Sequence, residues 1–303
     1  MKVMRRLRVV LLVVFVSFGV LSGCGGDGGG DGGIPSEPSF WNVRNSGTGN
    51  TLFGIGAFSA QAVAVGGLGT ILTSTDGITW TSRSSGITFH LNGVAASGTT
   101  AVAVGDVGAI ISSTDLASWT PRTSGTTNRL RGVAWTGTQF VAVGDAGTIL
   151  TSPDGTSWTP QTSGTTSDLY AAAASSAIIV VVGAGGAFTS PTGTTWTLRT
   201  SGGRGVVWSG TQFLLVSPAQ TSFDGITWTG RTLPIANTML AVTSSGSEFM
   251  TVGTFGQTQH SSDGISWTGE NFGMTIAGSL NGVAWNGTRF IAVGDSGVII
   301  TAP

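Results

Sequence analysis

The chain has 303 residues, a formal net charge of −1 at pH 7 and charged side chains at only 9% of its positions. It is long enough to bury a sizeable core, but it lacks the clustered basic residues that binding to nucleic-acid phosphates requires. Its one cysteine excludes a disulfide within the chain.

The first 23 residues have the charge and hydropathy order of an export signal. A basic stretch with Lys2 and Arg5 precedes an apolar run over residues 9–21, which is too short to span a bilayer comfortably. The run ends in Leu21-Ser22-Gly23-Cys24, which resembles the lipobox of bacterial lipoproteins. The resemblance implies that residues 1–23 are a lipoprotein signal peptide, cut before Cys24, and that Cys24 is lipidated. The alternative is a free thiol beside an ordinary signal-cleavage site.

Residues 24–39 are expected to be the lipidated cysteine and a Gly-rich tether. Gly-rich chain of this length behaves as a flexible coil with a mean reach of about 20–25 Å. Its aspartates lack the spacing of a calcium loop, so we expect no metal there. Without residues 1–23 the formal net charge becomes −5, and no basic segment follows Cys24 to hold anionic lipid. We therefore expect an exported protein that is held on a membrane by its lipid only and faces the periplasm or the cell surface.

Tryptophan recurs at almost constant intervals through the rest of the chain. The intervals are 39, 39, 39, 38, 32 and 39 residues, between Trp41, Trp80, Trp119, Trp158, Trp196, Trp228 and Trp267. A period near 40 indicates an array of one supersecondary unit. In the clearest copy, apolar and β-branched runs at 130–135, 139–144, 147–152 and 158–162 predict four short strands. We expect each repeated tryptophan to be buried between neighbouring units, which is worth about 2–3 kcal/mol.

The two ends of the repeat region are complementary. Six units begin near residues 52, 91, 130, 169, 203 and 239, whereas the seventh has three strands between Leu280 and Thr301 and finds its fourth at residues 40–44. A terminal strand that completes the last unit closes a ring, whereas an open solenoid needs polar capping units. The sequence therefore predicts an all-β fold for residues 40–303, a seven-bladed β-propeller of four-stranded blades.

A turn of the form Ser-x-Asp-Gly-x-x-Trp precedes the fourth strand of most units. Its carboxylates belong to Asp76, Asp115, Asp154, Asp224 and Asp263. The turn resembles the Asp-box, or BNR repeat, of sialidases, shortened by one residue, and the whole repeat resembles the photosystem II assembly and stability factor propellers. Such a carboxylate accepts backbone N–H bonds within its turn, while the glycine takes a positive φ. We therefore expect a structural role for these aspartates rather than a ring of catalytic or metal-binding acids.

Catalytic residues do not stand out. Sialidases use an arginine cluster and a tyrosine nucleophile activated by a glutamate, yet the single tyrosine here, Tyr170, has no glutamate in its own unit. His90 and His260 belong to different units, which does not suit zinc. We expect no enzyme activity and no cofactor. Because repeated aspartates could still supply a glycosidase pair, glycan binding or hydrolysis is the alternative function.

Residues that break the repeat are the candidates for binding a partner. The turns between second and third strands share one face with the loops that lead to the next unit, and the Asp-box turns belong to the other face. The first face receives Arg129, Arg131, Arg204, Asp106, Asp145 and Asp295. Loops on a rigid scaffold commonly carry recognition, and arginine is favoured at hot spots, although these could equally be solvated loop charges. We expect a monomeric scaffold or assembly factor that binds another envelope protein on this face and turns its Asp-box face to the membrane.

A second arginine series follows the repeated tryptophan by three residues. Its members are Arg44, Arg83, Arg122, Arg199 and Arg231. We expect these side chains on the rim, with the stem packed on the blade and the guanidinium in water.

Overall fold

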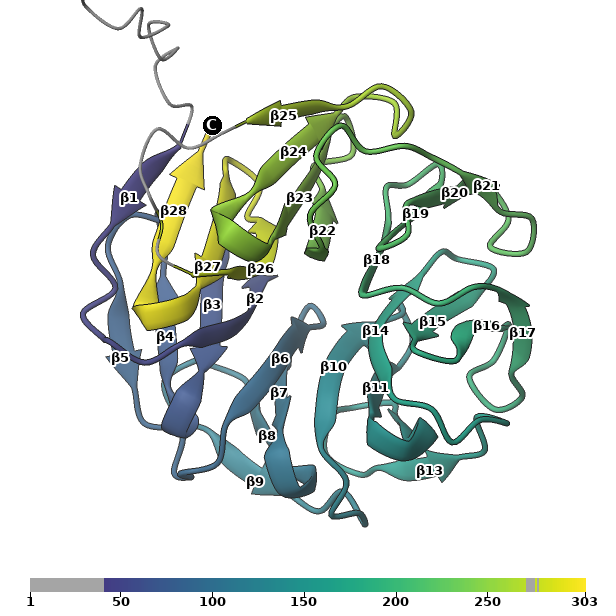
Figure 1. The fold of residues 1–303 in the computed structure, drawn as a ribbon. Helices are drawn as coiled ribbons and strands as arrows, with labels where there is room; N and C mark the ends of the chain where they lie inside the picture. Colours follow the sequence, from purple (N-terminus) through teal and green to yellow (C-terminus); the bar gives the residue numbers. More distant parts are fainter. Residues whose placement is uncertain (1–40, 271–275, 277) are drawn as a thin grey trace, which may run out of the picture. The chain divides into compact units, whose positions relative to one another are not determined.

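Seven four-stranded antiparallel sheets surround a central axis (Figure 1). The structure is a computed structural model that describes residues 41–270, 276 and 278–303. It confirms the all-β, seven-bladed propeller with four strands in each blade. The predicted signal peptide, Cys24 and the tether lie outside the described residues.

Each blade runs from an innermost strand near the axis to an outer strand on the rim. Blade 1 contains β2 (Leu52–Phe58), β3 (Gln61–Gly66), β4 (Ile71–Ser74) and β5 (Thr81–Arg83). Blade 2 contains β6 (Leu91–Ala96), β7 (Ala101–Gly105), β8 (Ile110–Ser113) and β9 (Thr120–Arg122). Blade 3 contains β10 (Leu130–Trp135), β11 (Phe140–Gly144), β12 (Ile149–Ser152) and β13 (Thr159–Gln161). Blade 4 contains β14 (Leu169–Ala174), β15 (Ile179–Gly183), β16 (Gly186–Ser190) and β17 (Thr197–Thr200). Blade 5 contains β18 (Gly205–Trp208), β19 (Phe213–Val216), β20 (Gln220–Ser222) and β21 (Thr229–Gly230). Blade 6 contains β22 (Met239–Ser244), β23 (Phe249–Gly253), β24 (Thr258–Ser261) and β25 (Thr268–Glu270).

Blade 7 is assembled from both ends of the described chain, as predicted. It contains β26 (Leu280–Trp285), β27 (Phe290–Gly294), β28 (Ile299–Ala302) and, as its outer strand, β1 (Asn42–Arg44). The register runs from Asn42 opposite Thr301 to Arg44 opposite Ile299. These ladder bonds and the side chains beneath them close the ring.

The core lies between blades rather than within them. The second strands, such as β7 and β11, are buried along their whole length, because another blade covers each face of the sheet. Phe140, Phe213 and Phe290 are among the largest fully buried side chains. Their rings contact tryptophans of the same blade, as in the 4.7 Å separation between the ring centroids of Trp135 and Phe140.

The repeated tryptophans pack between blades, but their burial is uneven. Trp41 and Trp119 are 3% and 9% exposed, whereas the other five are half-buried. Full burial of every ring was therefore too strong an expectation. Trp119 is better covered because Leu116, which replaces the glycine of its turn, packs in the same core cluster. Leu116 adopts the left-handed conformation that glycine takes elsewhere, with φ of 61°.

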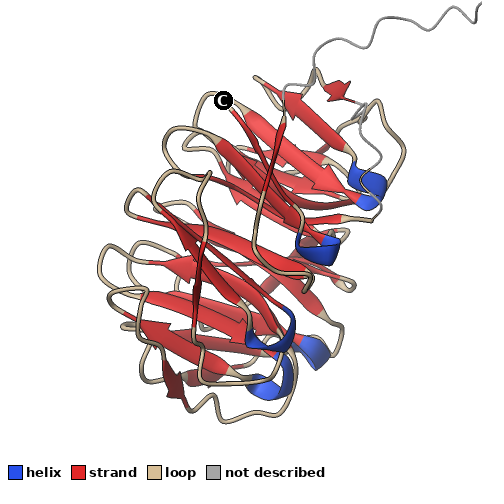
Figure 2. Ribbon diagram, turned by 90° about the vertical axis from the view of Figure 1, so that its left-hand side faces the viewer, coloured by secondary structure: helices blue, strands red, loops and turns tan. Residues whose placement is uncertain are grey.

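The turns divide between two faces of the propeller. Short helical turns join second to third strands in five blades, namely η1 (Gly67–Gly69), η2 (Asp106–Gly108), η3 (Asp145–Gly147), η4 (Thr254–Gly256) and η5 (Asp295–Gly297). They lie along one side of the disc in Figure 2, which we call the helical-turn face. The Asp-box turns, between third and fourth strands, lie on the opposite side, the Asp-box face. Within the described part of the chain, no helix is long and apolar enough to cross a membrane.

Candidate functional site

Seven side chains surround the opening of the central channel on the helical-turn face. In six blades the register shifts by one residue near the start of the innermost strand, so its second residue is a β-bulge outside the regular ladder. Bulges re-aim side chains and are common beside functional sites. In blade 5, Arg204 takes the corresponding place, and its N–H donates to the Val216 carbonyl at 2.9 Å. We call these residues the mouth ring: Phe53, Asn92, Arg131, Tyr170, Arg204, Leu240 and Asn281. They line a channel of about 230 Å³.

A ring of small residues follows the mouth ring along the strands. It consists of Gly54, Gly93, Gly132, Ala171, Gly205, Ala241 and Gly282. A Cβ added to Gly132 would lie 2.6 Å from the Tyr170 carbonyl oxygen of the next blade. The backbones of neighbouring blades thus approach closely at the axis, which holds the mouth ring on a rigid support.

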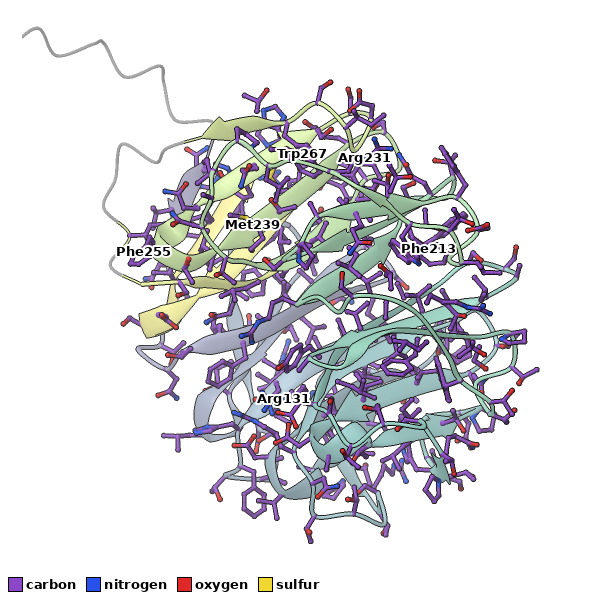
Figure 3. All side chains as sticks on the ribbon, turned by 45° about the vertical axis from the view of Figure 1, so that its right-hand side comes forward. Arg131, Phe213, Arg231, Met239, Phe255 and Trp267 are labelled. Carbon is purple, nitrogen blue, oxygen red and sulfur yellow. The ribbon has the colours of Figure 1, made fainter. Side chains whose placement is uncertain are left out.

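Two arginines converge on the single tyrosine. The guanidinium carbons of Arg131 and Arg204 lie 5.4 Å and 4.9 Å from the centroid of the Tyr170 ring. Both distances are within the range of cation–π attraction. Figure 3 shows Arg131 in the interior of the ring, away from the rim. Three blades therefore contribute to one cluster.

The two guanidiniums differ in their other partners. The Nε of Arg131 donates to Asp145, and its Nη2 lies 3.1 Å from Asp168 Oδ2. Asp168 also accepts the Ala146 N–H at 3.1 Å, so this pair ties the loop before β14 to η3. Arg204 is exposed and makes no ion pair with any residue that the structure describes. It is the guanidinium of this cluster that can offer its N–H groups to a ligand.

The remaining candidate charges are held by side chains and backbone groups around the mouth. Asp106 accepts the Nε of Arg129 at 2.7 Å and the side-chain amide of Asn92 at 2.9 Å. Asp295 accepts the side-chain amide of Asn281 at 3.0 Å and the N–H of Ser279 at 2.9 Å. These groups are half-buried and engaged, so they shape the mouth rather than stand free as solvated loop charges.

The charge around the mouth is nearly balanced. Arg129, Arg131 and Arg204 face four carboxylates, those of Asp106, Asp145, Asp168 and Asp295. A general anion-binding surface would need an excess of positive charge. The site instead offers one exposed cation beside an aromatic ring, within a frame of fixed ion pairs and amides.

The Asp-box turns have the hydrogen bonds of a self-contained structural turn. Asp76 Oδ1 accepts the N–H groups of Ile78 and Thr79 at 2.7 Å and 2.8 Å, and Ser74 Oγ accepts the N–H of Gly77 at 2.8 Å. These backbone bonds lower the pKa of Asp76 from 3.8 to about 2, and bonds from Thr227 and Ile226 do the same for Asp224. The same kind of turn lowers the pKa of the other three Asp-box carboxylates, those of Asp115, Asp154 and Asp263. Each carboxylate is directed at its own turn.

Each arginine of the rim series makes the same kind of hydrogen bond. The Nε of each donates to a hydroxyl on the neighbouring third strand at 2.8–3.0 Å, in Arg44, Arg83, Arg122, Arg199 and Arg231. Gln161 makes the equivalent bond to Thr151 at 2.9 Å. The series is a repeated brace between the two outermost strands.

The two histidines belong to different blades and have separate partners, and His90 also lies edge-on to Phe53 of the mouth ring, with 5.7 Å between the ring centroids. His90 Nδ1 accepts the Leu68 N–H at 3.0 Å, and His260 Nδ1 lies 2.6 Å from Glu248 Oε1. No group of three or more His, Cys, Asp or Glu side chains within the described residues is placed to hold a metal ion.

Sequence reasoning missed two members of the cluster, Tyr170 and Asp168. Tyr170 was considered only as a sialidase-type nucleophile. The useful signal was variability. At the mouth-ring position successive blades have Phe, Asn, Arg, Tyr, Arg, Leu and Asn, whereas the residue that follows is always Gly or Ala.

The fold defines the chain as a seven-bladed β-propeller. A YCF48 protein bound to a D1 peptide is similar at 17% identity, with a TM-score of 0.70 over 89% of this chain and 99% of that chain. YCF48 from Cyanidioschyzon merolae is similar at 17% identity, with a TM-score of 0.68 over 86% and 98%. A streptogramin B lyase matches at 8% identity, with a TM-score of 0.77 over 86% and 96%. The predicted resemblance to assembly-factor propellers is confirmed at the level of the fold. No protein-family model and no curated protein matches the chain.

Proposed function

We propose that this propeller is a non-catalytic scaffold or assembly factor of the bacterial envelope, and that it binds another protein at the mouth ring. The observation that carries the proposal is Arg204, an exposed guanidinium without an acidic partner in the described chain, stacked on Tyr170 beside Arg131. Arginine and tyrosine are enriched among residues that dominate protein interfaces.

The rigid surroundings of the cluster support the same function. Ion pairs and amide bonds fix Arg131, Asp106 and Asp295 before any partner arrives. A preorganised surface loses less conformational entropy on binding. One of the similar propellers was solved with a bound peptide, which is consistent with a protein ligand here.

An enzymatic function has weaker support. The similar propellers include a lyase, so the fold itself is compatible with catalysis. The carboxylates of the mouth, however, are held by arginine, amide or backbone donors, and the face of Tyr170 is covered by two guanidiniums. These contacts occupy the groups that an acid–base pair would need, and they leave Tyr170 without a free face on which a sugar could stack.

The proposal includes the lipid anchor on Cys24, with residues 1–23 as signal, residues 24–39 as tether and residues 40–303 as a monomeric propeller. Several acyl chains on one residue hold a protein stably on a membrane. The partner is therefore expected in the same envelope compartment. Mass spectrometry of the N-terminal peptide tests the anchor by itself.

The test of the binding site is in-cell cross-linking followed by mass spectrometry. Wild type is compared with Arg204→Ala at equal abundance, and with Arg199→Ala as a matched control, because Arg199 is an exposed arginine of the rim. We expect wild type and the control to enrich the same protein, and Arg204→Ala to lose it. A hot-spot arginine is worth about 2 kcal/mol, or about 30-fold in affinity.

Two results would contradict the proposal. If no protein is enriched with any form, the scaffold function is wrong. If Arg204→Ala captures the partner as well as wild type does, the site is elsewhere. Arg129 and Arg131 are unsuitable for this test, because their loss leaves Asp106, Asp145 and Asp168 without their cation.

A further inference from the structure

Among the described residues, large exposed apolar side chains occur on both faces of the propeller. Those of the helical-turn face are Leu68, Phe89, Val107 and Phe255, and the Asp-box face has four of its own. Ile78, Phe223, Ile226 and Ile265 are 39%, 76%, 45% and 53% exposed. Three of them occupy one position of the repeat, directly after the Asp-Gly pair, where the other Asp-box turns have Ala117, Thr156 or Thr194. Because equivalent positions of a repeat lie at equal height, these side chains project to a common level.

The four side chains are confined to one part of the ring. They belong to blades 5, 6 and 1, which together with blade 7 are four consecutive blades of the ring; blades 6 and 1 flank blade 7 directly. In blade 7 the start of β1 lies beside the end of β28, with Asn42 opposite Thr301. The 40 residues that precede Trp41, with the proposed anchor among them, therefore join the propeller at this part of the Asp-box face.

A cation lies within the same sector. Arg289 belongs to the hairpin that joins β26 and β27, and its aliphatic stem packs over Gly77 of the Asp-box turn in blade 1. It makes no ion pair with the described residues, and its Nε is buried without a hydrogen-bond partner there. We call Ile78, Phe223, Ile226, Ile265 and Arg289 the apolar arc.

We propose that the apolar arc rests on the surface of a lipid bilayer, so that blades 5, 6, 7 and 1 lie nearest the membrane and the mouth ring faces away from it. The choice of lipid as the occupant rests on the proposed anchor at Cys24. Exposed Ile and Phe side chains enter the boundary between headgroups and acyl chains, and a long arginine side chain reaches lipid phosphates from an apolar surface.

The negative charge of the Asp-box face indicates which lipid headgroups it would contact. The carboxylates of Asp76, Asp224 and Asp263 lie in the same turns and are ionised at neutral pH, and backbone N–H groups lower their pKa values further. The chain after residue 23 is also acidic overall. Contact with zwitterionic lipid is therefore favoured over contact with strongly anionic lipid.

The two faces offer a closely matched pair for the experiment. Phe223 on the Asp-box face and Phe255 on the helical-turn face are 76% and 75% exposed, and Figure 3 shows Phe255 projecting on the side of the helical turns. Neither substitution removes a buried side chain. Because Cys24 is the single cysteine of the chain, acylation leaves the wild type without a thiol that can react.

The experiment attaches an environment-sensitive fluorophore to Phe223→Cys and, separately, to Phe255→Cys in the lipidated protein on phosphatidylcholine vesicles. We expect a blue-shifted emission, quenched by nitroxide-labelled lipid, at residue 223 and not at residue 255. Adding Arg289→Gln to Phe223→Cys should reduce the quenching. Equal emission at both positions, or no quenching at residue 223, would overturn the proposal.

Labelling of the wild type tests the anchor on Cys24 separately from the membrane contact of the apolar arc. If the wild type takes up fluorophore, Cys24 is not acylated and the anchor is refuted. The two variants are then compared in a Cys24→Ser background with excess vesicles, and an unshifted emission at residue 223 would overturn the membrane contact as well. Neither result bears on protein capture at the mouth ring, which the Arg204 comparison measures.

Discussion

Gly132→Ala tests whether the blades truly meet at the axis. The added Cβ would lie 2.6 Å from the Tyr170 carbonyl oxygen and 3.4 Å from the Ala171 Cα. Close carbon–oxygen contacts in proteins are about 3.3–3.6 Å, so two strands must separate by several tenths of an ångström. Overpacking of this kind costs about 1–3 kcal/mol, offset by about 0.4–1 kcal/mol because alanine restricts the unfolded chain. We expect a net loss of about 1–2 kcal/mol.

The assay is thermal unfolding followed by circular dichroism. At about 2–4 °C per kcal/mol for a domain of this size, Gly132→Ala should melt roughly 2–8 °C below wild type. Gly98→Ala is the control, because a Cβ there meets no atom within 4 Å. It should leave the melting temperature unchanged or raise it slightly. If both variants melt together, the close approach of the blades at the axis is wrong.

Three further predictions concern closure, charge and acid. Trp41→Ala should lower the free energy of unfolding in urea by about 3–5 kcal/mol, and by clearly more than Trp158→Ala, because Trp41 is buried in the closing blade whereas Trp158 is half-buried. Equal losses in the two variants would argue against closure by β1. Arg131→Gln should lower the free energy of unfolding by about 1 kcal/mol, and this loss should be smaller in 1 M salt, because the ion pairs to Asp145 and Asp168 are partly exposed. A loss that does not depend on salt would point to packing instead. Asp76 stabilises the fold above its unfolded pKa of 3.8 and loses this effect as the pH falls through about 2. Asp76→Asn should therefore cost at most about 1 kcal/mol at pH 6 and only a small part of that at pH 2, where the carboxyl is half protonated; a constant difference would refute the turn bonds.

The fold follows from the sequence because its repeat is regular. The period of Trp41 to Trp267 sets the number of blades, and the lone strand at residues 42–44 has one vacant edge to pair with, that of β28. Strand order then follows, because consecutive short strands joined by tight turns pair as antiparallel neighbours. Burial at single positions does not follow from the period, as Leu116 and Trp119 demonstrate.

The mouth cluster could be predicted only in part. Arg131 and Arg204 stood out as departures from the repeat, and both belong to the cluster. Their convergence on Tyr170 depends on β-bulges, which change the face on which a side chain lies and leave no clear mark in the sequence. The partners of Asp106 and Asp145 were equally hidden, because they lie on the neighbouring inner strand or on the loop before it.

We propose different roles for the two faces, because the mouth ring opens on one of them and the described chain begins on the other. One face combines a rigid channel mouth with a cation that has no ion-pair partner among the described residues. The other carries the apolar arc on blades 5, 6, 7 and 1, and the proposed anchor joins the propeller at blade 7. A protein held in this way would present its mouth ring away from the membrane.

The most direct measurement places a photoreactive amino acid at Leu240, in the mouth ring, or at Leu198, an exposed leucine on the rim strand β17. The two proteins are irradiated in cells, and their adducts are identified by mass spectrometry. The account predicts one protein cross-linked from Leu240, absent from Leu198 and lost when Arg204→Ala is added. Adducts from Leu198 alone, or none from Leu240, would contradict a protein-binding site at the channel mouth.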